Sequence, residues 1–464
     1  MEVLKKISYS IIAQLIVLVG SVITILFLPK QLSIADYACY QMFLMLQNCV
    51  CLFDIGWPDG LYLKIGGKDF SELNKPLVNM QYWAFYALQI CFFAISLSIS
   101  LSIGDLDISR VFSLSCVGIL IFVPRIFLDL LFQATYRIKE CATIAVIDRV
   151  GSLCFVVLFL VLDITQFEYY IGANLIGAFA SLCFATYQAK SVIFVSPRGI
   201  EFRFFRKEVK TNIIKGFPLM IANFANQFGI VIIKTAIQYN WNLETFGKIS
   251  FTFTFISFVL TFFRAVSLSV FPALRRASVE KVNQIYKDLR YVFILLFLCI
   301  FIFYYPCKRL MMLWLPQYAE SLNYLAILLP LCIFESRSTI LFESYLKNVG
   351  RERSLLVNNI ILVGLSFFLA VVVCFVNSLV FAVVMIFLLY CIRGILLECL
   401  VSKGVGYNCF PGICIDLFCS CVIWGCLWFS PGIEGALIYV VFVVGILFFQ
   451  RKNIVQIARR VKSV

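Results

Sequence analysis

Apolar runs of about twenty residues recur along the whole chain, and they constrain its fold more than any other feature of the sequence. A helix of about twenty apolar residues spans the hydrocarbon core of a bilayer. Hydrophobic residues make up 62% of the 464 and charged residues 14%, whereas a soluble domain is about half apolar and a quarter charged. The sequence therefore predicts an all-α polytopic membrane protein of about fourteen transmembrane helices. We expect them at 7–29, 37–56, 80–103, 111–133, 145–163, 168–192, 213–235, 247–272, 289–306, 321–346, 355–376, 379–401, 410–429 and 434–450.

The first run, which follows Lys5 and Lys6, could be mistaken for a secretion signal. It is too long for the apolar region of such a signal and is not followed by a small-x-small cleavage site. We therefore expect it to remain as the first span.

Basic residues between the runs predict which loops are cytoplasmic, because Lys and Arg gather on that side. If the N-terminus is inside and the spans alternate, the inside carries Lys64, Lys68, Lys75, Arg137, Lys139, Arg149, Lys190, Arg198, Arg203, Arg206, Lys207, Lys210, Lys215, Arg275, Arg276, Lys281, Lys287, Arg290, Lys347, Arg351, Arg353, Lys403, Arg451, Lys452, Arg459, Arg460 and Lys462. The outside carries Lys30, Arg110, Lys248, Lys308 and Arg309. We expect an even number of spans with both termini in the cytoplasm. This bias accounts for the net charge of +14 without a nucleic-acid partner.

Two pairs of matching segments indicate an internal repeat. Leu131–Arg137 matches Leu341–Lys347, and Ser33–Tyr37 matches Asn242–Phe246, at a shared offset of about 210 residues. Six helices per repeat is an even number, so the two halves have the same orientation and should enclose a central cavity, as in many transporters. The expected parts are a first six-helix half at 1–200, a second at 201–404, and two further helices with a basic tail at 405–464.

The chain contains no histidine, and its nineteen cysteines are mostly scattered singly within apolar runs. Histidine is the usual base near neutral pH and the commonest zinc ligand. Single cysteines in apolar runs are typical of small apolar core residues. We expect no catalytic residue, no metal and no cofactor.

Five cations lie inside apolar runs: Arg125, Lys234, Arg264, Arg337 and Arg393. An arginine at the centre of a span costs about 3 kcal/mol, so these side chains either pair with acids or face a wet, functional cavity. The acids within reach are Asp54, Asp129, Glu335, Glu343 and Glu398, which could also carry coupling protons or Na⁺. Neutralisation of the arginines is the simpler interpretation of these acids.

Pairing with an acid and contact with a ligand are not equally favoured for each of these cations. Arg125 and Asp129 stand at i, i+4 on one helix face, so pairing and ligand binding remain equally open for Arg125. Arg264 and Lys234 have no acid in their own spans. Arg264 is therefore the strongest candidate for an anionic ligand, while Lys234 could instead extend to the outer interface.

Glycine and proline interrupt two of the runs, at Gly56–Gly60 and at Gly216–Pro218. Such residues permit a bend, either an ordinary kink or a gating hinge. We expect spans two and seven to bend there.

The layout resembles the polysaccharide and O-antigen flippases (Wzx type) of the multidrug/oligosaccharidyl-lipid/polysaccharide (MOP) exporter superfamily. The resemblance covers nearly the whole chain and includes Leu28-Pro29 to Tyr37, Asp54-Ile-Gly56, Gly216-Phe-Pro218, two six-helix halves and a terminal pair. It implies a bacterial inner-membrane protein whose substrate is an undecaprenyl-diphosphate-linked oligosaccharide. The cavity cations Arg264, Arg125, Arg337, Arg393 and Lys234 would meet the diphosphate and acidic sugars. Other polysaccharide-assembly proteins, such as a polymerase and a chain-length regulator, would be its partners.

Two alternatives follow from the same residues. A drug or metabolite antiporter of the same superfamily is disfavoured because its cavity should offer acids to a cationic drug. A membrane-embedded polymerase or ligase needs a large extracytoplasmic loop, and the longest expected one runs only from Pro306 to Ser321. We therefore expect a transporter rather than an enzyme.

Overall fold

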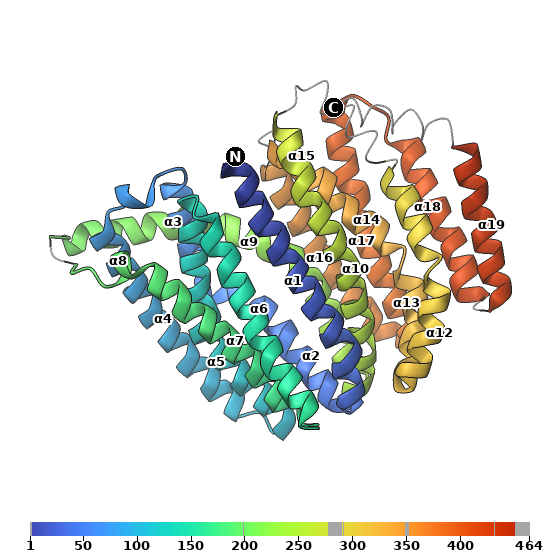
Figure 1. Ribbon diagram of the computed structural model, residues 1–464, viewed down its shortest axis with the longest axis horizontal. Helices are drawn as coiled ribbons and strands as arrows, with labels where there is room; N and C mark the ends of the chain where they lie inside the picture. Colours follow the sequence, from blue (N-terminus) through green and yellow to red (C-terminus); the bar gives the residue numbers. More distant parts are fainter. Residues whose placement is uncertain are drawn as a thin grey trace. The chain divides into compact units, whose positions relative to one another are not determined.

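The computed structural model describes residues 2–197, 199–276, 290, 292–348, 352–430 and 432–450, with side chains omitted at 2–15, 17, 226–227, 262–276, 340, 344, 347–348, 352–353 and 449. Every regular element within these ranges is a helix (Figure 1). The chain divides into two compact units, Met1–Val231 and Ile232–Val464, which are described separately below.

The first unit contains ten helical elements and most of an eleventh. They are α1 (Glu2–Gln31), α2 (Ile34–Cys49), the 3₁₀ helix η1 (Val50–Asp54), α3 (Trp57–Ile65), the 3₁₀ helix η2 (Phe70–Glu72), α4 (Lys75–Leu101), α5 (Leu106–Ala134), α6 (Ile138–Val161), α7 (Phe167–Gln188), α8 (Lys190–Ile193) and α9 (Phe202–Asn240), whose last residues belong to the second unit.

The second unit continues with the following elements. They are α10 (Leu243–Arg276), a helix over Val292–Phe301, α12 (Tyr304–Trp314), the 3₁₀ helix η3 (Pro316–Tyr318), α13 (Ala319–Leu328), α14 (Leu331–Arg337), the π-helix η4 (Ser338–Phe342), α15 (Glu343–Asn348), α16 (Glu352–Val376), α17 (Leu379–Val405), α18 (Phe410–Trp424), the π-helix η5 (Gly425–Phe429) and α19 (Ile433–Phe449).

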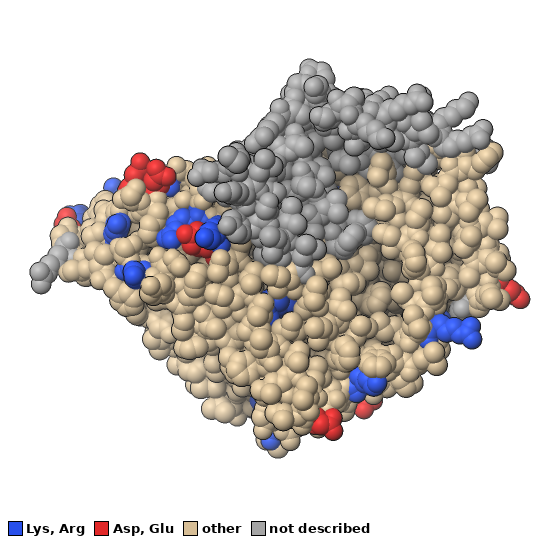
Figure 2. Space-filling view, viewed as in Figure 1, with Lys and Arg blue, Asp and Glu red and all other residues tan. Residues whose placement is uncertain are grey.

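The predicted fold class is confirmed: the protein is an all-helical, multi-pass membrane protein. Among the described residues, eight helices are long and apolar enough to cross a membrane, or up to twelve if each bent pair is one span. Two shorter apolar helices, Leu18–Gln31 and Ile433–Phe448, overlap the first and last predicted spans. A count of fourteen therefore requires that both of these also cross. Figure 2 shows a mostly uncharged described surface, as expected of a surface in contact with lipid.

The predicted break in span two is confirmed. The chain bends by 63° between η1 and α3. Ile55 and Gly56 take positive φ angles of 50° and 75° there, and the Asp54 Oδ1 accepts a hydrogen bond from the Gly56 N–H at 2.7 Å. The left-handed conformation at two successive residues ends the first helix and starts the second.

Span seven bends, but not at the expected place: α9 is helical through Gly216–Pro218, and the bend of 52° lies between Phe202–Ala225 and Phe228–Asn240. Gly216 instead lies at a close contact between α9 and α3. A Cβ on Gly216 would collide with the backbone of Gly56 and Gly60, and one on Gly60 would collide with the Asn212 carbonyl. The two glycine motifs therefore form one close crossing of α3 and α9, where small residues let the backbones approach.

An aromatic core lies between α3, α4 and α5 in the first unit. Phe85 and Phe127 are fully buried, with ring centroids 5.4 Å apart, and Trp57 meets Phe85 edge to face at 5.7 Å. Aromatic pairs of this geometry add stability beyond the area that they bury. The core fixes α3, and with it the crossing to α9.

The loop charges assign each helix end of the first unit to one side of the membrane. Two ion pairs join helix ends that are assigned to the same side. At the predicted outer end, Arg110 Nη1 lies 3.2 Å from Glu168 Oε1. At the predicted inner end, the Lys64 ammonium contacts the Glu208 carboxylate. These pairs join segments far apart in sequence, so they support alternation of the spans. The side on which the termini lie stays a prediction.

The segments matched by the repeat have matched local structure in the two units. Ser33 accepts a hydrogen bond from the Asp36 N–H at 3.0 Å, and Asn242 accepts one from the Thr245 N–H at 2.8 Å. Each thus caps the helix that follows it. The division into parts at 200 and 404 stays a prediction, and the boundary between compact units lies within α9.

Candidate functional site

The second unit contains a buried ion-pair network, and Arg393 of α17 forms its first half. Its Nη1 lies 2.5 Å from Glu335 Oε2 on α14, and its Nη2 lies 2.7 Å from Glu343 Oε1 on α15. Arg393 is 3% exposed and Glu335 is 6% exposed. Two predicted acids and one predicted cation therefore meet, and their charges offset one another in a region of low dielectric.

Asp416 of α18 forms the other half. Its carboxylate contacts the Arg337 guanidinium of α14 and lies 3.1 Å from Arg290 Nη2. Arg290 Nε also lies 2.6 Å from Glu398 Oε1, which accepts a hydrogen bond from the Tyr407 hydroxyl at 3.2 Å. The network thus ties α14, α17 and α18 to Arg290.

Asp416 and Arg290 were missing from the predicted site. Arg290 stands at the expected start of a span and was assigned to a cytoplasmic loop. Asp416 is the only charged residue in the apolar run 410–429. A lone acid in a membrane span is a signal of function or pairing, so it could have been found.

The described members of the network are three arginines and four carboxylates. Within the described residues, Arg337 Nη1, Arg393 Nε and Asp416 Oδ1 are buried with no hydrogen-bond partner. These three atoms keep free hydrogen-bonding capacity inside a network whose other described groups are paired.

Arg125 of α5 is paired as well, with a partner that the sequence did not indicate. Its Nη1 lies 2.6 Å from Asp148 Oδ2 on α6 and 3.0 Å from the Ser181 hydroxyl on α7. Asp129, the expected i, i+4 partner, instead accepts a hydrogen bond from Gln133 at 2.9 Å. Arg125 points across to α6 and α7 rather than along its own helix.

The two units place opposite charges at equivalent positions of the repeat. The shared offset of about 210 residues aligns Arg125 with Glu335. Arg125 contacts Ser181 on α7, and Glu335 contacts Arg393, two positions beyond the equivalent of Ser181, on α17. The same helix pair is therefore bridged in each unit, with the arginine on different helices.

Lys234 differs from these arginines because its described surroundings are aromatic. It is 8% exposed, and its Nζ lies 5.4 Å from the ring centroids of both Phe246 and Phe253. In the part of the chain that the structure describes, no carboxylate forms an ion pair with it. Aromatic faces attract a cation but do not neutralise it, so the charge remains available to an anion.

The two remaining predicted residues are Asp54 and Arg264. Asp54 is 2% exposed and holds the bend before α3 through the Gly56 N–H. Arg264 lies in α10, but its side chain is outside the described residues. The substrate-contact role of the five cations stays a prediction.

No protein-family profile matches the chain, and no curated protein matches it by sequence. Solved structures do match. The lipid II flippase MurJ, in an inward closed conformation, aligns with a TM-score of 0.66 at 13% identity, covering 97% of this chain and 100% of that one. An inward-facing multidrug resistance MATE family transporter of the MOP superfamily aligns at 0.61 and 12% identity, covering 85% and 98%.

A third structure is a MOP superfamily transporter from Pyrococcus furiosus, described as having a binding pocket of reverse polarity that suggests a different function. It aligns with a TM-score of 0.52 at 13% identity, covering 87% of this chain and 96% of that one. At such identities the likeness establishes the fold alone. The chain has the fold seen in these MOP superfamily transporters, and its membership of the superfamily stays a prediction.

Proposed function

We propose that the protein is a flippase that moves an undecaprenyl-diphosphate-linked oligosaccharide from the cytoplasmic to the periplasmic leaflet of a bacterial inner membrane. The observation that carries the proposal is Lys234, a buried cation whose described neighbours are aromatic rings rather than acids. A buried cation without a carboxylate is costly unless an anion reaches it. The likeness to MurJ over the full length of both chains supports a lipid-linked substrate.

The described carboxylates of the second unit argue against export of a cationic drug. Glu335 and Glu343 contact Arg393, and Asp416 contacts Arg337. A cationic ligand would therefore have to displace an arginine to reach any of these three acids. This is why we prefer an anionic substrate to the antiporter alternative, although MATE transporters share the fold.

The cations divide into two groups in this proposal. Lys234 and Arg264 contact the diphosphate directly. The guanidinium groups of Arg337 and Arg393 are held by carboxylates, so they contact substrate only if those pairs open during transport. Arg125 is intermediate between the two groups: it is paired with Asp148, but its side chain is 18% exposed.

The membrane potential supplies a driving force for such a substrate. A diphosphate diester carries about two negative charges, and an inside-negative potential of about 100 mV favours outward movement by about 2.3 kcal/mol for each charge. Alternating access of the two halves would carry the headgroup across while both termini remain in the cytoplasm.

Deletion of the gene tests this proposal in cells. The mutant should accumulate unpolymerised lipid-linked repeat units on the cytoplasmic side and lose surface polysaccharide. A strain that lacks redundant exporters and still makes normal surface glycan would rule out the assignment.

A further inference from the structure

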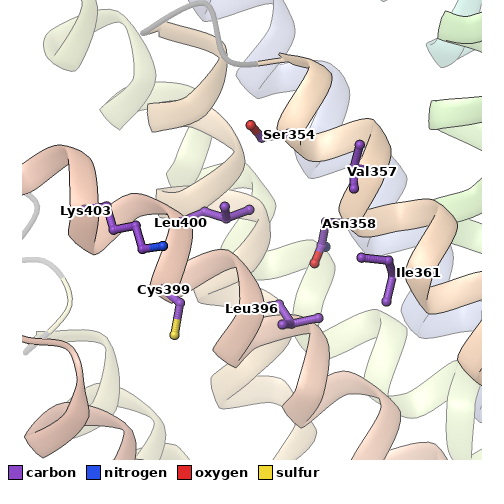
Figure 3. A pocket seen from close by; sticks show the side chains of 8 residues that line it. All are labelled: Ser354, Val357, Asn358, Ile361, Leu396, Cys399, Leu400 and Lys403. Atoms are coloured by element: carbon purple, nitrogen blue, oxygen red, sulfur yellow. The ribbon is translucent and has the colours of Figure 1, made fainter.

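A pocket of about 420 Å³ lies between α16 and α17 of the second unit, apart from the ion-pair network (Figure 3). Its wall is formed by Ser354, Val357, Asn358, Ile361, Leu396, Cys399, Leu400 and Lys403. The volume is within the usual range of ligand pockets, about 300–1,000 Å³.

The lining changes from polar to apolar along the helices. Ser354 lies two residues after α16 begins at Glu352, and Lys403 lies two residues before α17 ends at Val405. Ile361 and Leu396 lie nine residues from those same ends, which corresponds to about 14 Å of helix. Figure 3 shows Ser354 and Lys403 at one end of the pocket and Ile361 and Leu396 at the other. A phospholipid has the same order of polarity, from phosphate to acyl chain.

Asn358 lies between these two ends and is the second sign of a ligand. Its side chain is 2% exposed, and it lines the pocket. Both Nδ2 and Oδ1 are without a hydrogen-bond partner among the described residues. A buried amide is stable only when its polar atoms are satisfied. The glycerol ester and headgroup oxygens of a phospholipid offer acceptors for Nδ2 at this depth.

The pocket opens on an exposed apolar surface of α16. Val357 and Ile361 are 48% and 51% exposed, and the same face of α16 continues through Phe368 at 64% and Phe375 at 84%. An apolar stripe at helical spacing on a membrane helix contacts acyl chains. A membrane lipid therefore reaches the pocket directly from the bilayer.

The charge at the polar end selects an anionic headgroup. Lys403 is exposed there and is the one charged side chain among the residues that line the pocket. Glu398, the acid of α17 nearest to Lys403 in the sequence, forms an ion pair with Arg290 rather than with Lys403. Basic residues near a membrane surface attract anionic lipid by about 1 kcal/mol each, which is about fivefold in affinity.

We propose that this pocket binds one anionic phospholipid. Lys403 and Ser354 hold the phosphate, Asn358 bonds the glycerol region, and the first part of an acyl chain lies along Ile361 and Leu396. The pocket is lined by none of the five cations proposed to meet the transported substrate, so its test does not depend on the proposed function.

The test uses the full chain purified in detergent, with phosphatidylglycerol as the probe. Native mass spectrometry counts retained lipid, and a thermal melt measures stabilisation by added lipid. Lys403→Gln should weaken phosphatidylglycerol binding about fivefold. Asn358→Leu should abolish retention and should raise the melting temperature of the lipid-free protein, because it removes an unsatisfied buried amide. Lys190→Gln, which removes a lysine from α8 in the first unit, should bind phosphatidylglycerol like the wild type.

Three results would overturn the proposal. The first is equal retention by the wild type, Lys403→Gln and Asn358→Leu. The second is equal retention of phosphatidylcholine and phosphatidylglycerol by the wild type. The third is displacement of phosphatidylglycerol by millimolar inorganic phosphate, which would make this a site for the free anion.

Discussion

The carboxylate of Asp416 on α18 contacts the guanidinium of Arg337 on α14, and both side chains are about 1% exposed. Removal of one partner from a buried pair leaves an uncompensated charge, at a cost of about 3–5 kcal/mol. Because Asp416 also lies 3.1 Å from Arg290, its removal would leave Arg337 without this carboxylate and Arg290 with Glu398 alone. The pair is therefore a structural requirement of the second unit, whatever its part in transport.

Asp416→Ala should accordingly lower the melting temperature and the yield of folded protein. Glu434→Ala is the control, because Glu434 is an exposed acid in the first turn of α19, and its loss should change stability by less than about 0.5 kcal/mol. A melt in detergent that shows equal stability for the two variants would contradict the network.

Gly60→Ala should destabilise the first unit, because the added Cβ would collide with the Asn212 carbonyl at the crossing of α3 and α9. A backbone shift of this kind typically costs about 1–3 kcal/mol. Gly364→Ala in α16 is the matched control, since a Cβ there meets nothing within 4 Å, and alanine is the better helix former. The thermal melt should fall for the first variant and stay or rise for the second, and the opposite order would refute the close crossing.

Reporter fusions test the topology. Fusions at Lys207 and Val464 should report the cytoplasm, and fusions at Asn242 and Pro431 the periplasm. Alkaline phosphatase and a fluorescent protein give opposite signals on the two sides. A periplasmic Lys207 would overturn the alternation and the parallel repeat with it.

The sequence predicted the helices well because apolar runs and glycine-proline breaks are local signals. Each of the fourteen expected spans overlaps a helix, and the bend at Gly56 follows from two residues with positive φ. The partners of Arg337 and Arg393 could not be read in the same way. Their acids lie 79 and 58 residues away in the chain, whereas sequence spacing reveals only i+3 and i+4 neighbours.

The close approach of Gly216 to Gly56 shows the same limit. The sequence marked both glycine motifs as points of bending, since an isolated glycine has no other local meaning. Their common role depends on the crossing of two helices, which brings together Gly56 and Gly216 from positions 160 residues apart in the sequence. Tertiary packing, and not local propensity, decides what such a glycine does.

Arg264→Ala should lose most transport while still inserting normally. A charge-assisted hydrogen bond to a phosphate in a partly dehydrated cavity is worth about 2 kcal/mol. Arg264→Lys should restore part of the activity, because it keeps the charge but lacks the planar fork that grips two oxygens. Wild-type surface polysaccharide from both Arg264→Ala and Arg264→Gln, at equal protein abundance, would show that this residue does not contact the substrate.

The most direct test of the flippase proposal is transbilayer movement measured in proteoliposomes. The purified protein is reconstituted with a fluorescent undecaprenyl-diphosphate-linked oligosaccharide, and a membrane-impermeant quencher reports the fraction in the outer leaflet over time. The wild type should move the lipid faster than protein-free vesicles, Lys234→Met should be strongly impaired, and Lys234→Arg should retain part of the rate. If folded wild-type protein moves the lipid no faster than empty vesicles, or if Lys234→Met matches the wild type, then Lys234 is not meeting a diphosphate and the account is wrong.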